Sequence, residues 1–340
     1  MSEDPDKIQE EENELYEHYN LRVDNGQGLL RIDKFLMNRI ENASRTKIQQ
    51  SAKAGNILVN HKAVRQNYKV KPGDSISIVL SYPPREIEVI PEDIPLEIVY
   101  EDGDLLFVNK PPGMVVHPAY ANYTGTLVNA LAHYLQKASG NEEAFPLLVH
   151  RIDKDTSGIM VVAKNELMQT HLARMFFDHA IERTYQALIW GNPERDQGTI
   201  TGHIARSMKD RKVFTVYPAG DRGKHAITHY RVLKRFRYVT LVECRLETGR
   251  THQIRVHFKH IGHPLFGDKT YGGDKILKGT TFTKYRQFIS NCFKMLPRQA
   301  LHAKSLGFLH PISKKEIFID SDLPEDMKQV VEKWEKYTGF

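Results

Sequence analysis

An aspartate in a polar loop between two apolar runs is the first candidate for chemistry in this chain. Residues 147–164 read LLVHRIDKDTSGIMVVAK, so Asp153 lies between two segments typical of buried strands. Sheet on both sides would hold a reactive side chain accurately, and Arg151, two residues earlier, places a cation nearby. By composition alone DKDTSG is an ordinary turn, in which a carboxylate is more often structural than catalytic.

Several longer motifs favour a catalytic role for Asp153 over a structural one. The order His-Arg-Ile-Asp, then Thr-Ser-Gly after two intervening residues, resembles the signature loop of the RluA family of pseudouridine synthases. The resemblance continues through VNKPPGMVVHP, RTYQALIWG, LETGRTHQIRVHFKHIGHPLFGDKTYGG and LHAKSLGFLHP, which follow in the family's order. Ile152 stands where the family usually has leucine, a conservative difference. The resemblance implies an RNA pseudouridine synthase.

The resemblance also implies a role for each motif residue. Asp153 corresponds to the catalytic carboxylate, and Arg255 in HQIR to the arginine paired with it. Tyr185 in RTYQA matches the tyrosine that stacks on the extruded uracil and is placed to assist removal of the C5 proton. Arg151 resembles the residue that enters the RNA stack where the target leaves, and Arg250 in TGRTH is a candidate phosphate ligand.

The implied reaction breaks the N1–C1′ bond of uridine, turns the uracil and joins C5 to C1′. A carboxylate facing C1′ can trap an oxocarbenium-like sugar covalently, or it can remove a proton from C2′ to give a glycal. The sequence leaves both routes open. Either route needs an ionised Asp153, which a nearby guanidinium would favour.

Neither a cofactor nor a metal is expected. The chain has no G-x-S-x-G elbow, Walker loop or G-x-G-x-x-G segment after a strand, and an isomerisation needs neither redox equivalents nor phosphoryl transfer. The histidines of the 246–273 motif raise a zinc hypothesis, but no cysteine or acid completes a recognisable ligand spacing; they are His252, His257, His260 and His263.

The charge distribution points to a polyanionic partner. Residues 1–20 hold eight acids against one lysine, so the net charge of +6 leaves +13 on residues 21–340. Residues 31–80 alone hold ten Lys or Arg against three acids. Such a surplus suits phosphate contacts, although a high pI can also serve solubility alone. We expect RNA as the partner, ribosomal or transfer RNA first.

The basic segment has its own pattern. Ile32, Phe35, Leu36 and Ile40 share one helical face, Ser44 offers an N-cap to a second helix, and strands are expected at 57–59 and 75–79. The run RIDKFLMNRIENASRTKIQQSAKAGNILVNHKAV resembles the S4 RNA-binding domain. Four cations on the two helices are candidates for RNA contacts, with a solvated helical surface as the alternative; they are Arg39, Arg45, Lys47 and Lys53.

We therefore expect an acidic flexible tail at 1–20, a small α/β S4-like domain at 21–81, a proline-containing linker at 82–96 and a catalytic domain at 97–340. The last domain should be α+β with a large, mainly antiparallel sheet, because many short strand-like runs alternate with few helices. Strands are expected at 105–109, 159–163, 185–190, 239–246 and 316–320, and the clearest helices at about 165–180, 252–260 and 324–337.

The compartment follows from what the sequence lacks. Its apolar runs are too short to cross a bilayer, and its acidic first residues do not resemble a signal peptide, so the cytoplasm is expected. The two cysteines, Cys244 and Cys292, cannot build a disulfide framework, and two separately buried thiols are expected. Oligomeric state is not readable.

Three other functions compete with this interpretation. The chain could be a non-catalytic RNA-binding or ribosome-assembly factor, an enzyme that cleaves the glycosidic bond without rejoining it, or a synthase acting on transfer RNA. The S4-like domain and the stretch VHPAYANYTGTLVNAL are most similar to the family's large-subunit ribosomal RNA enzymes of the D type. Large-subunit ribosomal RNA is therefore the expected substrate.

Overall fold

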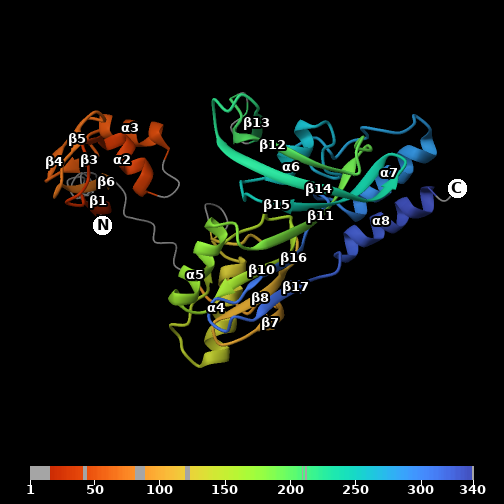
Figure 1. Ribbon diagram of the computed structural model, residues 1–340, viewed down its shortest axis with the longest axis horizontal. Helices are drawn as coiled ribbons and strands as arrows, with labels where there is room; N and C mark the ends of the chain where they lie inside the picture. The colour runs from red at the N-terminus through yellow and green to blue at the C-terminus, as the bar shows by residue number, and fades with distance from the viewer. Residues whose placement is uncertain are drawn as a thin grey trace, which may run out of the picture. The chain divides into compact units, whose positions relative to one another are not determined.

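The computed structural model describes residues 16–40, 44–80, 89–118, 123–208, 210 and 213–338. The chain divides into two compact units, with the division between residues 87 and 88 (Figure 1). Each unit has its own sheet and its own hydrophobic core.

In its described residues, the N-terminal unit combines two helices with a small antiparallel sheet. Its elements are α2 (Ile32–Arg39), α3 (Arg45–Lys53), a sheet in the order β1 (Tyr16–Arg22), β6 (Ser75–Leu80), β3 (Ile57–Val59) and β4 (Lys62–Ala63), and the pair β2 (Leu30–Arg31) and β5 (Lys69–Val70). Ile32, Phe35 and Leu36 are buried on α2, and the Ser44 hydroxyl caps α3 by accepting from the Lys47 amide. Both predicted helices are confirmed.

The tail and the linker expected from the sequence both lie partly outside the described residues. The tail expected at 1–20 lies outside the described residues up to residue 15, and from Tyr16 the chain forms β1, antiparallel to β6. The linker expected at 82–96 lies outside them up to residue 88. Beyond it, Asn129 Nδ2 donates to the Ile90 carbonyl over 2.8 Å and the Glu92 amide to the Asn129 carbonyl over 3.0 Å. Residues 16–20 form a strand instead of the expected tail because hydrogen bonds to β6 satisfy their backbone.

The C-terminal unit is built on one large sheet of eleven strands among the described residues. The strands run in the order β13 (Phe214–Tyr217), β12 (Gln197–Arg206), β14 (Lys224–Phe236), β15 (Val239–Leu246), β11 (Glu182–Trp190), β16 (Leu301–Leu309), β10 (Ser157–Ala163), β8 (Leu105–Lys110) and β7 (Glu97–Glu101), with β17 (Glu316–Asp320) on β16 and β9 (Leu147–Leu148) on β10. All of these pairs are antiparallel except β10 with β16. The predicted α+β fold with a mainly antiparallel sheet is confirmed.

Five helices of the described chain flank this sheet; they are α4 (Leu127–Ser139), α5 (Glu166–Phe177), α6 (Gln253–His260), α7 (Thr283–Met295) and α8 (Glu325–Thr338). In Figure 1, α4 and α5 lie beside β8 and β10, whereas α7 and α8 lie near the β11, β14 and β15 end. Trp190 and Phe266 are fully buried with Trp334 of α8. The sequence predicted α5, α6 and α8 and did not single out α4 and α7.

The parallel pair β10 and β16 meets at a glycine. Gly158 has φ of +119°, and a side chain there would collide with the backbone carbonyl of Ala303 on β16. Only glycine combines this backbone conformation with such a close approach. The contact fixes the point where the loop bearing Asp153 enters the sheet.

The structure also bears on the two cysteines and on the length of the apolar helices. Cys244 and Cys292 are both buried and unpaired, as expected. None of the helices in the described part of the chain is long and apolar enough to cross a membrane.

Candidate active site

The loop between β9 and β10 carries Asp153, and neighbouring segments clamp its backbone. The buried Lys110 ammonium donates to the carbonyl of Lys154 over 3.0 Å, and to those of Pro111 and Met114 over 2.8 and 2.9 Å. Arg298 Nη1 donates to the Asp155 carbonyl over 2.9 Å. The backbone carbonyls of Lys154 and Asp155, the two residues after Asp153, are thus bound by one side chain from earlier in the chain and one from later in it.

Asp153 is paired with Arg255, as the motif resemblance implied. Arg255 Nη1 lies 2.9 Å from Asp153 Oδ2, and the Asp153 side chain is 24% exposed. The other side of the guanidinium is held by Asp268 through two hydrogen bonds of 2.7 and 2.9 Å, and Tyr271 lies under it with 5.1 Å from Cζ to the ring centroid. Burial would lower the pKa of Arg255, but Asp268 and Asp153 outweigh it and raise that pKa. A permanent positive charge therefore faces the carboxylate.

His252 approaches the second oxygen of the same carboxylate. Its Nε2 lies 3.8 Å from Asp153 Oδ1, and its Nδ1 lies 2.8 Å from the Tyr271 hydroxyl. Burial lowers the pKa of His252 despite the charge of Asp153, so the imidazole is neutral at pH 7. Because the Phe214 amide donates to the Tyr271 oxygen, that hydroxyl is free to donate to Nδ1. The proton then resides on Nε2, facing Asp153.

A cavity of about 530 Å³ opens beside this group. It lies within the size range of small-ligand pockets. Five side chains singled out from the sequence line it together, although they come from three separate parts of the chain; they are Arg151, Asp153, Tyr185, Arg250 and Arg255. The cavity thus combines one carboxylate with several cations and an aromatic ring.

Another part of the cavity wall carries the aromatic rings of His150 and Phe176 beside Arg183. His150 stacks on Phe176 with 4.7 Å between ring centroids, and the Arg183 guanidinium lies 5.3 Å from the same Phe176 ring. His150 Nε2 accepts from the Val161 amide, and burial with the Arg183 charge lowers the pKa of His150 to about 3, so this imidazole stays neutral. Such a wall suits a flat, uncharged ring.

Tyr185 lies on β11 beside Arg183. Burial raises the pKa of the Tyr185 phenol, an effect that the Arg183 charge opposes and the Asp153 charge reinforces. The phenol is therefore protonated at neutral pH. Arg183 is the cation that would stabilise a phenolate, should Tyr185 release its proton during a reaction.

Comparison with known proteins shows to which protein family this chain belongs. Residues 104–260 match the family model described as RNA pseudouridylate synthase, and residues 30–76 match the S4 domain model. A Chlorobaculum parvum protein, named an uncharacterized RNA pseudouridine synthase, is 45% identical over 317 residues, which cover 92% of this chain and 96% of that protein. This chain belongs to the RluA family of RNA pseudouridine synthases. It is an isomerase, and its S4 domain binds RNA.

Two further matches show how far this likeness extends. The Escherichia coli protein named Ribosomal large subunit pseudouridine synthase D is 41% identical to this synthase over 304 residues, covering 89% of this chain and 90% of that protein. The solved structure named Human RNA Pseudouridylate Synthase Domain Containing 4 aligns with a TM-score of 0.55 and 23% identity, covering 70% of this chain and 93% of that one. The structural match shows a shared fold.

In the S4 domain of this synthase, the four predicted cations fall into two groups. Arg45 Nε lies 3.1 Å from Asp33 Oδ2, and Arg39 Nη2 lies 2.6 Å from Asp24 Oδ2. Asp33 is fully buried, and although burial raises its pKa, hydrogen bonds from Gln49, Arg31 and Arg45 hold it at about 2. Lys47 and Lys53 are exposed and belong to none of the ion pairs in the described residues. Within the part of the chain that the structure describes, these two lysines therefore have no carboxylate partner.

Three of the four histidines considered for zinc have other partners. His257 Nδ1 contacts the Thr228 hydroxyl at 2.9 Å and His263 Nδ1 contacts the Trp190 carbonyl at 2.8 Å, while His252 contacts Tyr271. Burial is the largest of the effects that lower the pKa of His257 to about 4. Each of these three rings is fixed by a local hydrogen bond within the catalytic unit.

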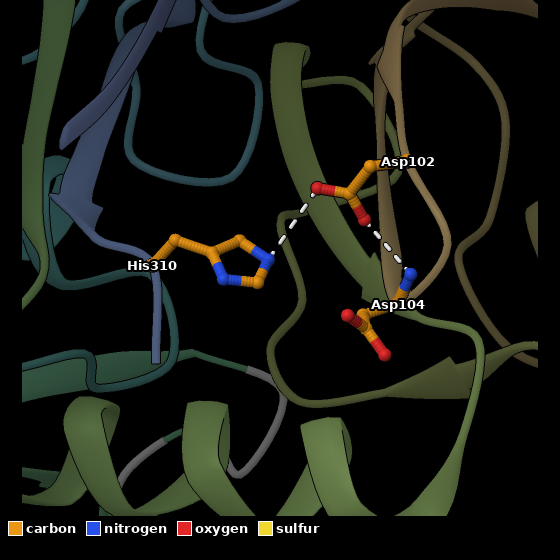
Figure 2. A group of neighbouring side chains, drawn as sticks. All are labelled: Asp102, Asp104 and His310. Atoms are coloured by element: carbon orange, nitrogen blue, oxygen red, sulfur yellow. Dashed lines mark hydrogen bonds and ion pairs between the residues drawn. The ribbon is translucent and has the colours of Figure 1, made fainter. Parts of the chain in front are cut away.

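One other group in the described part of the chain has metal-ligand spacing; it consists of Asp102, Asp104 and His310 (Figure 2). His310 Nδ1 accepts from the amides of Ile312 and Ser313, so the ring proton resides on Nε2, 3.4 Å from Asp102 Oδ2. A nitrogen that carries a proton cannot ligate a metal. Asp102 also accepts from the Asp104 amide. The contact between His310 and Asp102 joins the end of β16 to the β7–β8 turn.

Several site residues were quoted within motifs but not singled out from the sequence. Asp268 and Lys110 are fully buried charges, and Arg183 borders the cavity. Burial of an acid or a lysine is rare and leaves no mark in a single sequence. Only the fold reveals that Asp268 orients Arg255.

Proposed function

We propose that Asp153 is the carboxylate that acts at C1′ of the target uridine, with Arg255 as its fixed counter-charge and Tyr185 beside the uracil. The observation that carries this proposal is the 2.9 Å contact between Arg255 and Asp153 in the same cavity that Tyr185 lines. Arg255 sets a positive charge against the carboxylate, and the aromatic side chains of the cavity suit an extruded base. Arg151 and Arg250 border the same cavity and are proposed to contact the RNA around the target.

Two routes are available to this carboxylate. In the first, an Asp153 oxygen bonds to C1′ as the N1–C1′ bond breaks, and C5 of the turned uracil then displaces the carboxylate. In the second, Asp153 removes the C2′ proton to give a glycal, and the proton returns to C2′ when C5 joins C1′. Both routes end with loss of the C5 proton, for which Tyr185 is the proposed nearby group, with Arg183 stabilising its phenolate.

The proposed substrate is large-subunit ribosomal RNA. Relatives from Zymomonas mobilis and Escherichia coli, 44% and 41% identical, carry the name Ribosomal large subunit pseudouridine synthase D. A ribosomal substrate is compatible with the cytoplasm as proposed compartment, while a plant relative is named chloroplastic. Transfer RNA is the alternative substrate. Family membership and the paired Asp153 argue against a purely non-catalytic assembly factor.

The test combines mapping with a catalytic variant. Pseudouridines are mapped by chemical probing in cells that lack the gene and in cells complemented with the parental chain, Asp153→Asn or the control Asp320→Asn, a surface carboxylate paired with Lys304. We expect a large-subunit uridine to lose its signal without the gene and regain it with the parent and the control only. RNA affinity of purified Asp153→Asn should stay within a few fold. Signal restored by Asp153→Asn would refute the assignment of Asp153, and signal lost only in transfer RNA would refute the substrate.

A further inference from the structure

Asp153 borders a second cavity as well as the one that contains Tyr185. This second cavity has a volume of about 380 Å³, and it shares Arg151, Asp153 and Arg255 with the first. Its remaining wall includes Lys154 from the loop after Asp153 and Lys269 from the segment after Asp268. Both cavities lie within the catalytic unit.

The second cavity has more positive charge than its own carboxylates neutralise. Arg298 in its wall is bound to Asp326 through hydrogen bonds of 2.7 and 2.8 Å. Lys154 and Lys269 are exposed, and neither belongs to an ion pair within the described part of the chain. Arg151 likewise has no carboxylate partner there. Besides Asp153, Asp155 is the one carboxylate in this wall.

The covalent structure of a nucleotide relates the two cavities. The base leaves the ribose at C1′, and the phosphates leave it at C3′ and C5′, so a base and its phosphates extend from one ribose in different directions. If Asp153 acts at C1′ and the uracil lies against Tyr185 and Phe176, a phosphate must lie about one ribose away from Asp153. The second cavity is adjacent to Asp153 and carries the unpaired cations that a phosphate requires.

We propose that the second cavity binds a backbone phosphate next to the target uridine, through Lys154 and Lys269. The proposal rests on the proposed role of Asp153 at C1′. Lysine ammonium groups are flexible point charges, so they can follow a phosphate without fixing its orientation. The phosphate contact would place the ribose so that C1′ faces the carboxylate, which makes Lys154 and Lys269 positioning residues for the extruded nucleotide.

The test is a thermodynamic cycle, in which the effect of a lysine substitution on RNA binding is measured with and without the charge on the phosphate. The probe is a stem-loop RNA in which the purified protein forms pseudouridine, prepared unmodified or with a methylphosphonate 5′ or 3′ of the target uridine. In all three RNAs the riboses on the 5′ side of these phosphates carry 2′-O-methyl groups, because a free 2′-hydroxyl would attack the neighbouring methylphosphonate and cleave the chain. Equilibrium Kd is measured for the full-length parent, Lys154→Gln, Lys269→Gln and the control Lys315→Gln, an exposed lysine in the turn before β17.

We expect Lys269→Gln and Lys154→Gln to weaken binding of unmodified RNA about 10- to 100-fold, as for a lost charge-assisted hydrogen bond. The slope of log K against log salt should become shallower by about 0.7–0.9 per lysine. One methylphosphonate should weaken the parent and Lys315→Gln by the full amount, and should weaken Lys269→Gln and Lys154→Gln by a smaller factor, because each variant retains one lysine at the phosphate. The proposal would be overturned if the lysine variants bound RNA like the parent. It would also be overturned if the methylphosphonate weakened the lysine variants by the same factor as the parent.

Failure of this proposal can be told apart from failure of the proposed catalytic role. Kd needs no turnover, so the cycle is repeated in the Asp153→Asn background, where chemistry is expected to be absent. Full pseudouridine formation by Asp153→Asn would disprove the role of Asp153. A cycle without coupling, together with an inactive Asp153→Asn, would disprove the phosphate site alone.

Discussion

Arg255 Nη1 donates to Asp153 Oδ2 over 2.9 Å, and this bond joins the start of α6 to a loop 102 positions earlier in the chain. The same guanidinium is anchored from behind by the fully buried Asp268. A substitution of Asp268 should therefore change the position of Arg255 and, through it, of Asp153, although Asp268 does not line the cavity.

Asp268→Asn should lower both activity and stability. Removing one charge from a buried pair costs about 3–5 kcal/mol of the free energy of unfolding, and the released guanidinium no longer holds Asp153 in place. The single-turnover rate should fall while RNA Kd changes little. Asp196→Asn is the control, because Asp196 forms a surface pair with Arg235 and should cost less than about 1 kcal/mol. A parental single-turnover rate in Asp268→Asn would show that Asp268 does not orient the site.

Tyr185→Phe separates stacking from proton transfer. The ring survives, but the phenol that Arg183 would stabilise as phenolate is lost. We expect the single-turnover release of tritium from C5-labelled RNA, with protein in excess, to fall by about 10²–10⁴-fold, as for a lost general acid–base group. Tyr230→Phe, on β14 outside the cavity, is the control. If the Phe variant releases tritium at the parental rate, Tyr185 is a stacking platform and the base lies elsewhere.

Lys110→Met should change the pH dependence of stability as well as the rate. Burial and the Arg298 charge lower the pKa of Lys110 from 10.5 to about 7. Between these values the unfolded chain binds more protons than the folded one, so the free energy of unfolding should rise with pH, by up to about 1.4 kcal/mol per unit from this group. The rise should be smaller in Lys110→Met. Below about pH 7 the group is protonated in both states and contributes no slope.

Tryptophan fluorescence during urea unfolding is the appropriate measurement for Lys110→Met, because the chain's two tryptophans, Trp190 and Trp334, both lie in the catalytic unit. The variant should also lose turnover, since the carbonyl of Lys154, next to Asp153, loses a hydrogen bond. Lys315→Met is the control for a lysine that is exposed. Parallel stability curves for the parent and Lys110→Met from pH 7 to 9 would contradict the lowered pKa.

Lys47→Gln and Lys53→Gln should reduce the salt dependence of RNA binding without changing the chemistry. Both lysines are exposed and free of ion pairs among the described residues, so each is able to neutralise a phosphate. The slope of log affinity against log salt should become shallower by about 0.7–0.9 per lysine, with an unchanged rate on saturating RNA. Arg45→Gln should instead destabilise the S4 domain, because it removes a partner of the buried Asp33. Slopes equal to the parent's would exclude these lysines from the RNA contact.

The sequence by itself determined the elements that have a clear local pattern and the identity of the central residues. Apolar positions at helical spacing predicted α2, and the hydroxyl of Ser44 predicted the start of α3, because these features depend on near neighbours. The motifs predicted Asp153, Tyr185 and Arg255 by residue type and order. The cavity contains all three.

The tertiary structure decided which charges remain free and which are used to hold the site. From the sequence, Arg45 and Lys47 were equal candidates for RNA, yet Arg45 is paired with Asp33 while Lys47 is not. Asp268 and Lys110 belong to familiar motifs, but only the fold shows that one orients Arg255 and the other holds the loop after Asp153. A side chain's partners come from strands and loops distant in the chain, and long-range pairing, unlike helix periodicity, is not encoded in the spacing of neighbouring residues.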